Sequence, residues 1–190
     1  QPTLTSQLAN SNYPQDGDAL GRYYNKNYPG TGVRYDATTS LFQSLPNANE
    51  ITWYCMKGDP RWDQFELWTT LGGLYRGGVW LKKKAVLQAE GNYSTEHAYD
   101  GSDFRVNYGT CTNNSTPSLP SPSEMNNYFY LPCLQKYMTG KLDNIAEGVY
   151  WTSSGDPARM TSAYRLAFNS AVINVGSFFR YAGVTSRPFE

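Results

Sequence analysis

From residue 128 onward the chain carries short apolar and aromatic segments at close spacing, and this pattern constrains the fold more than any other feature. The segments predict strands over residues 128–131, 148–151, 163–168, 172–175 and 181–185. In the third segment Leu166 and Phe168 fall on one side and Arg165, Ala167 and Asn169 on the other, because successive side chains of a strand point to opposite faces. In the fourth, Ile173 and Val175 alternate with Val172 and Asn174. We therefore expect an antiparallel sheet of half-buried strands with one face open to solvent.

The residues before this region predict helices. Asn47 can cap a helix with Glu50 three residues later, a capping-box spacing, and Ile51, Tyr54 and Cys55 then share one face. Residues 58–60 (Gly-Asp-Pro) end this helix. Two further short helices are predicted over residues 63–71 and 18–24.

The remaining segments predict strand or loop. The glycine-rich residues 72–78 favour loop and strand, and strand character resumes over 80–87. Residues 88–127 are polar, rich in proline and long for a loop, so we interpret them as an insertion. Residues 1–44 are a turn-rich lead-in. We expect one α+β domain over residues 1–190.

The charge balance argues against a nucleic-acid partner. Lys plus Arg and Asp plus Glu both number 16, whereas phosphate binding normally requires a basic excess. The only basic run, Lys82 to Lys84, is interpreted as a solvated strand end or loop. Charged residues make up only 17% of a chain with 16 tyrosines, a composition that favours rigid amphipathic contact surfaces. No apolar run is long enough for a transmembrane segment.

The three cysteines, Cys55, Cys111 and Cys133, leave two arrangements open. A Cys111–Cys133 bridge and three buried thiols are both compatible with the odd count. The chain begins at Gln1 with a polar stretch, and we interpret it as a secreted protein whose leader has been removed.

A group of C-terminal motifs gives more specific information about the fold than composition does. They occupy residues 128–132 (Tyr-Phe-Tyr-Leu-Pro), 148–154 (Gly-Val-Tyr-Trp-Thr-Ser-Ser), 163–170 (Ala-Tyr-Arg-Leu-Ala-Phe-Asn-Ser) and 180–188, which ends in Arg-Pro. This block resembles the C-type-lectin-like domains of fimbrial tip proteins and surface lipoproteins of gut anaerobes, and those of variable proteins diversified by retroelements. With the upstream residues 46–60, the resemblance covers roughly residues 45–190. It implies a C-type-lectin-like fold, which is shared with formylglycine-generating enzymes.

The resemblance also implies two sets of positions. Framework positions are Trp151, Ser153, Ser154, Leu166, Phe168, Ile173, Val175, Gly183 and Arg187. Positions that differ between relatives, and so form the candidate ligand-binding site, are Arg165, Ala167, Val172, Asn174, Ser177, Phe178, Phe179, Tyr181 and Ala182. Exposed aromatic residues and an Arg are good anchors at the centre of a contact. The alternative is that the two Phe are core residues, but two adjacent side chains of a strand cannot both face inward. At least one of them is therefore expected to be exposed or in a loop.

The calcium signatures of sugar-binding C-type lectins are absent: no Glu-Pro-Asn or Gln-Pro-Asp loop and no Trp-Asn-Asp strand occurs. A single histidine, His97, and scattered cysteines give no zinc pattern. We therefore predict no metal and no cofactor.

The leading hypothesis is a non-enzymatic ligand-binding or adhesion module at the cell surface, on a pilus tip or lipoprotein, or on a virion. Its expected partner is a host or bacterial surface protein or a glycan. The alternative is an enzyme on the same fold. Asp59, Asp63 and Glu66 lie near Trp62 and Trp68, as in carbohydrate-active enzymes. A formylglycine-generating activity would require Cys111 and Cys133 as its copper-binding pair.

Overall fold

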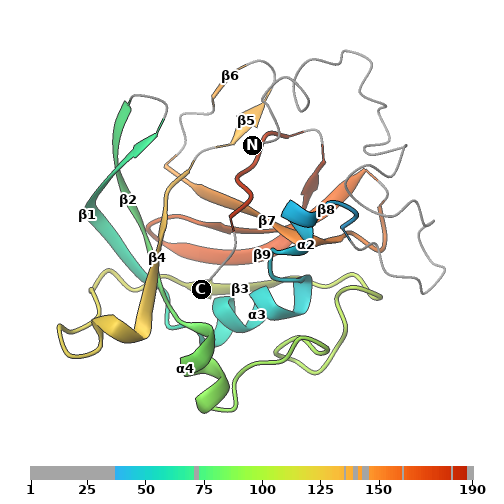
Figure 1. The fold of residues 1–190 in the computed structure, drawn as a ribbon, viewed down its shortest axis with the longest axis horizontal. Helices are drawn as coiled ribbons and strands as arrows, with labels where there is room; N and C mark the ends of the chain where they lie inside the picture. Colours follow the sequence, from blue (N-terminus) through green and yellow to red (C-terminus); the bar gives the residue numbers. More distant parts are fainter. Residues whose placement is uncertain are drawn as a thin grey trace.

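The computed structural model describes residues 37–70, 73–134, 136–138, 141–142, 146–159, 161–180 and 182–187. This part of the chain is α+β, with few helices and antiparallel sheets (Figure 1). The helix predicted over 18–24 lies outside the described residues, as does most of the predicted lead-in.

A four-stranded sheet with the order β3-β9-β8-β7 forms the centre of the molecule (Figure 1). Its strands are β3 (Cys111–Asn114), β7 (Gly148–Gly155), β8 (Ser162–Phe168) and β9 (Val172–Phe179), and every pair is antiparallel. The predicted strands at 148–151, 163–168 and 172–175 are confirmed. The predicted strand over 181–185 is wrong: Gly183 and Thr185 make only isolated bridges, to Tyr137 and Tyr150.

Both faces of β8 are buried, so the expected solvent-facing side is wrong for this strand. Leu166 and Ala167, on opposite faces, are each 0% exposed. One face packs on helix α3 (Ala48–Lys57). The other face packs on helix α2 (Ser40–Gln43), through Phe42, and on the segment that carries Ala182 and Val184. A strand covered on both sides can carry apolar residues at consecutive positions, whereas alternation is required only where one face meets water.

Helix α3 begins and ends where the sequence predicts. The Asn47 side chain accepts hydrogen bonds from the amides of Asn49 and Glu50, and Glu50 Oε2 accepts one from the Asn47 amide at 2.7 Å. The amide of Ala48 donates to Ser154 Oγ of β7 at 3.0 Å, which attaches the start of the helix to the sheet. Gly58 caps the C-terminal end.

A second sheet, with the order β1-β2-β4, carries a hairpin that projects from the body (Figure 1). Its strands are β1 (Arg61–Thr70), β2 (Gly73–Lys82) and β4 (Tyr128–Pro132). The predicted strand at 128–131 is confirmed, and so is strand structure within 72–78. The helix predicted over 63–71 is wrong, because β1 pairs with β2 on both sides of an irregularity between Asp63 and Leu67, and the pairing overrides local preference.

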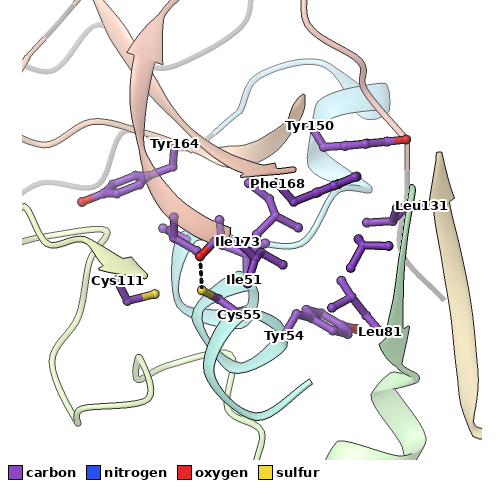
Figure 2. Close-up of a cluster of buried hydrophobic side chains, with 14 of the residues drawn as sticks. Ile51, Tyr54, Cys55, Leu81, Cys111, Leu131, Tyr150, Tyr164, Phe168 and Ile173 are labelled. Atoms are coloured by element: carbon purple, nitrogen blue, oxygen red, sulfur yellow. Dashed lines mark hydrogen bonds between the residues drawn. The ribbon is translucent and has the colours of Figure 1, made fainter. Parts of the chain in front are cut away.

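The strand predicted over 80–87 is right only to Lys82, where β2 ends, and helix α4 (Lys84–Ala89) follows. The small hairpin of β5 (Tyr137–Met138) and β6 (Lys141–Leu142) completes the sheets. Figure 2 shows side chains of α3 lying between the central sheet and the second sheet, so that one core cluster includes residues of both.

The predicted insertion over 88–127 is mostly irregular, with only β3, the end of α4 and the 3₁₀ turn η1 (Met125–Asn127) as regular structure. It is nonetheless held by a polar network. Asn49 of α3 donates to the Glu96 carbonyl and to Asp103 Oδ1, both at 2.9 Å, and accepts from the Phe104 amide at 2.8 Å. The buried Arg105 binds Asp103 and Glu96. The polar side of α3 therefore fixes the insertion.

Candidate recognition surface

Strand register divides the predicted ligand-binding residues between the two faces of the central sheet. Asn174 lies opposite Ala167, and Phe178 lies opposite Ala163, so Arg165, Asn174 and Phe178 share the α2 side. On the other face, Ser177 lies opposite Tyr164.

Two of the predicted residues are core residues. Ala167 is 0% exposed and Ala182 is 1% exposed, and both belong to the cluster that contains Val149 and Trp151. The expectation that they form part of an exposed surface is therefore wrong. Ala167 lies in the part of the sheet that α2 and the C-terminal segment cover, and Ala182 lies in that segment on its packed side; a small side chain is what this close packing accepts. Tyr181 lies outside the described residues.

Three of the remaining residues form a half-buried group that also includes Lys136 and Glu147. Arg165 Nη1 donates to Asn174 Oδ1 at 2.6 Å, and its guanidinium lies 5.8 Å from the centroid of the Phe178 ring. Lys136 Nζ lies 5.4 Å from the same ring and 3.1 Å from Glu147 Oε2. Two cations thus contact one aromatic ring, an arrangement that orients the ring without a hydrogen bond. Burial lowers the pKa of Arg165, although the nearby Glu147 acts in the opposite direction.

Phe179 is the most exposed of the predicted residues that the structure describes. Its side chain is 46% exposed and its ring centroid is 5.9 Å from that of Phe178, which is half-buried. The prediction that at least one of the two Phe is exposed is confirmed. Val172 and Ser177 are half-buried.

Sequence reasoning missed an aromatic residue near this region. Tyr108, in the irregular segment, is also 46% exposed and stacks on Tyr164, with ring centroids 6.2 Å apart. The Arg159 guanidinium lies 5.9 Å from the Tyr108 ring. Register places Tyr164 and Phe179 on the same face of the sheet. No local pattern marks Tyr108, because it reaches the sheet only through tertiary packing.

A second candidate site is a cleft of about 350 Å³ beside the β1–β2 hairpin. It is lined by Glu66, Leu67, Trp68, Lys83, Tyr128, Phe129, Tyr130, Leu131, Pro132 and Arg187. Trp68 stacks on Tyr75 with ring centroids 4.8 Å apart and an interplanar angle of 15°. The hairpin also exposes Phe65 (70%), Leu67 (51%) and Leu74 (67%), which is unusual for apolar side chains of this size.

The structure does not gather the three carboxylates of the enzyme hypothesis into this cleft. Asp63 is buried and accepts hydrogen bonds from the amides of Phe65 and Glu66 and from Trp80 Nε1. Asp59 binds Arg61 and accepts from the Tyr128 hydroxyl at 2.7 Å. Burial raises the pKa of Asp59, but these hydrogen bonds outweigh it and the net pKa lies below its usual value. Of the three, only Glu66 lines the cleft.

The other candidate chemical groups are dispersed. His97 is exposed, and its carbonyl accepts a hydrogen bond from Trp53 Nε1 at 2.8 Å. Within the described ranges, no three His, Cys, Asp or Glu side chains come together as a metal site would require. Cys55, Cys111 and Cys133 are all buried free thiols, and Cys111 contacts Cys55 rather than Cys133. Of the two arrangements left open by the sequence, the structure has three buried thiols.

Among the described residues, no helix has the length and hydrophobicity to cross a membrane. Comparison with protein-family models finds no matching family, and comparisons with curated proteins and with solved structures find no match either.

Proposed function

We propose that the protein is a non-enzymatic ligand-binding or adhesion module with a C-type-lectin-like fold, and that residues around Phe178 and Phe179 contact the ligand. Its partner is a host or bacterial surface protein or a glycan. The setting proposed is extracellular: a pilus tip, a surface lipoprotein or a virion.

The main support for this proposal is the difference in burial between the framework positions and the candidate ligand-binding positions of β8 and β9. Framework residues Leu166, Phe168, Ile173 and Val175 are at most 1% exposed. Interleaved with them in β8 and β9, Arg165, Asn174 and Phe178 are half-buried, and Phe179 at the end of β9 is exposed. A rigid sheet that presents side chains at fixed spacing loses little conformational freedom on binding. This is the arrangement that a binding surface tolerant of substitution needs.

The experiment that tests the proposal is a binding screen with the purified chain against an array of surface glycans and a panel of immobilised extracellular proteins. For any ligand found, Phe178→Ala and Phe179→Ala should weaken binding by about tenfold or more, the effect of losing an anchor residue. Phe65→Ala is the matched control, because Phe65 is a more exposed Phe on the distant hairpin. A ligand whose binding depends on Phe65 and not on Phe178 or Phe179 would overturn the assignment of the surface.

The aromatic cleft favours a second candidate function, carbohydrate binding at the hairpin. Trp68 and Tyr130 line the cleft together with Glu66 and Arg187, which combines flat apolar surfaces with groups that can bind hydroxyls. Here Trp68→Ala should abolish glycan binding, whereas Phe179→Ala should leave it unchanged. Turnover of a glycoside that is lost in Glu66→Gln would instead support the carbohydrate-active enzyme.

A further inference from the structure

Two of the three buried thiols lie against each other in the main core. Cys55 is near the end of α3 and Cys111 is the first residue of β3. The Cys111 side chain is a close neighbour of the Cys55 thiol, and Figure 2 shows the two sulfur atoms pointing toward one another. Cys55 Sγ also donates to the Ile173 carbonyl of β9 at 3.5 Å.

Neighbouring hydrogen bonds hold both cysteines in place. Asn113 Nδ2 of β3 donates to the Cys55 carbonyl at 3.0 Å, which joins the two elements beside the thiols. Cys111 pairs in register with Val175 of β9. Cys55 is 0% exposed and Cys111 is 5% exposed. Both cysteines are thus presented by regular elements in mutual contact, whereas a disulfide between distant or diverging side chains would require backbone movement.

We propose that Cys55 and Cys111 form a disulfide bond that joins α3 to β3 when the chain folds in an oxidising environment. The bond closes a loop from residue 55 to residue 111, which contains the β1–β2 hairpin, α4 and the first part of the irregular insertion. Cys133 remains a thiol, since it follows β4, where its amide donates to the Gly77 carbonyl of β2, and the neighbour of Cys55 is Cys111 instead. This inference does not depend on the proposed function.

The oxidant is a small-molecule disulfide such as oxidised glutathione. The thiolate of one cysteine attacks this disulfide, forming a mixed disulfide and releasing one glutathione thiolate. The thiolate of the second cysteine attacks the protein sulfur of the mixed disulfide and releases the second glutathione. Overall, the protein loses two protons and two electrons, and one glutathione disulfide becomes two thiols.

Burial determines when this exchange occurs. Contact with Cys111 and burial raise the pKa of Cys55 well above its usual value, so the folded protein holds almost no reactive thiolate there. The exchange therefore takes place before the core closes, and once formed the bond is protected from reductant by the same burial.

The test is a refolding experiment on the full chain in a mixture of oxidised and reduced glutathione. The product is quenched in acid and its free thiols are alkylated in denaturant without reductant. Intact mass should show a single alkyl group per chain. A non-reduced peptide map, made with a protease that cleaves after Glu and so separates Cys111 from Cys133 at Glu124, should place the alkyl group on Cys133 and link the peptides of Cys55 and Cys111. Three alkyl groups, or a linked peptide that contains Cys133, would overturn the proposal.

Cysteine variants test which two thiols form the disulfide bond. The Cys133→Ser variant should keep the linked peptide and take up no alkyl group. In the wild type and in Cys133→Ser, reductant should lower the thermal midpoint, whereas in Cys111→Ser the midpoint should not respond to reductant. If Cys111→Ser does not fold, the peptide map of the wild type and of Cys133→Ser still decides between the outcomes.

Discussion

The substitution Asn49→Ala tests whether the irregular insertion is an integral part of the fold. The Asn49 side chain is 0% exposed, and it bonds the Glu96 carbonyl, Asp103 and the Phe104 amide. Truncation leaves these partners without Asn49, and each buried group left unsatisfied costs about 1–3 kcal/mol. Alanine recovers less than about 0.7 kcal/mol through its better helix propensity. The net loss in the free energy of unfolding should be about 2–5 kcal/mol, a large part of the stability of an ordinary domain.

The loss can be measured by urea unfolding and by calorimetry. For a chain of this length, it corresponds to a fall in Tm of roughly 5–15 °C. Hydrogen exchange should accelerate at the amides of residues 96–105, because the insertion loses its attachment to α3. Asn114→Ala is the control, since Asn114 is an exposed residue of β3, and its unfolding free energy should change by less than about 0.5 kcal/mol. If Asn49→Ala loses no more unfolding free energy than this control, the hydrogen bonds of Asn49 do not hold the insertion.

Three further predictions concern stability. Trp151→Ala should cost about 3–5 kcal/mol in chemical denaturation, since Trp151 is 3% exposed in the second core cluster; a loss below about 1 kcal/mol would contradict its placement. Burial raises the pKa of Asp103, but hydrogen bonds from Arg105 and Asn49 outweigh it and the net pKa lies below its usual value. The resulting stability is present above about pH 4 and is lost as the pH falls through the lower folded-state pKa. Urea midpoints across this range should show the loss, and Arg105→Met should flatten it; an unchanged slope would refute this cause. Finally, reduction of a Cys55–Cys111 bond should lower the unfolding free energy by roughly 4 kcal/mol, from the loop it closes, and no loss on reduction would exclude a stabilising bond.

Residues whose structure depends on near neighbours in the chain were predictable. The capping box of Asn47 and Glu50 defines the start of α3, because its hydrogen bonds are made within one turn of helix. The strands β7, β8 and β9 were recognised because β-branched and aromatic residues concentrate in them. The alternation in β9 also correctly placed Ile173 and Val175 in the core.

Tertiary structure decided the features for which the local pattern was ambiguous. Residues 63–71 have apolar spacing compatible with a helix, and the pairing with β2 makes residues 63–70 part of a strand. The sequence assigns Ala167 and Ala182 to a surface, but small residues occur both on surfaces and at close-packed contacts. Here both lie in the contact between the central sheet and the C-terminal segment.

The candidate sites also combine features that the sequence predicts with features that only the tertiary structure shows. The sequence by itself determined that Phe178 and Phe179 point to opposite faces of a strand, which follows from the two-residue period of the backbone. It did not determine that Arg165 and Lys136 contact the Phe178 ring, that Tyr108 reaches the central sheet, or that Cys111 meets Cys55. Such contacts join residues far apart in the chain. They are set by how the sheets and α3 pack against each other, and no local sequence pattern records that packing.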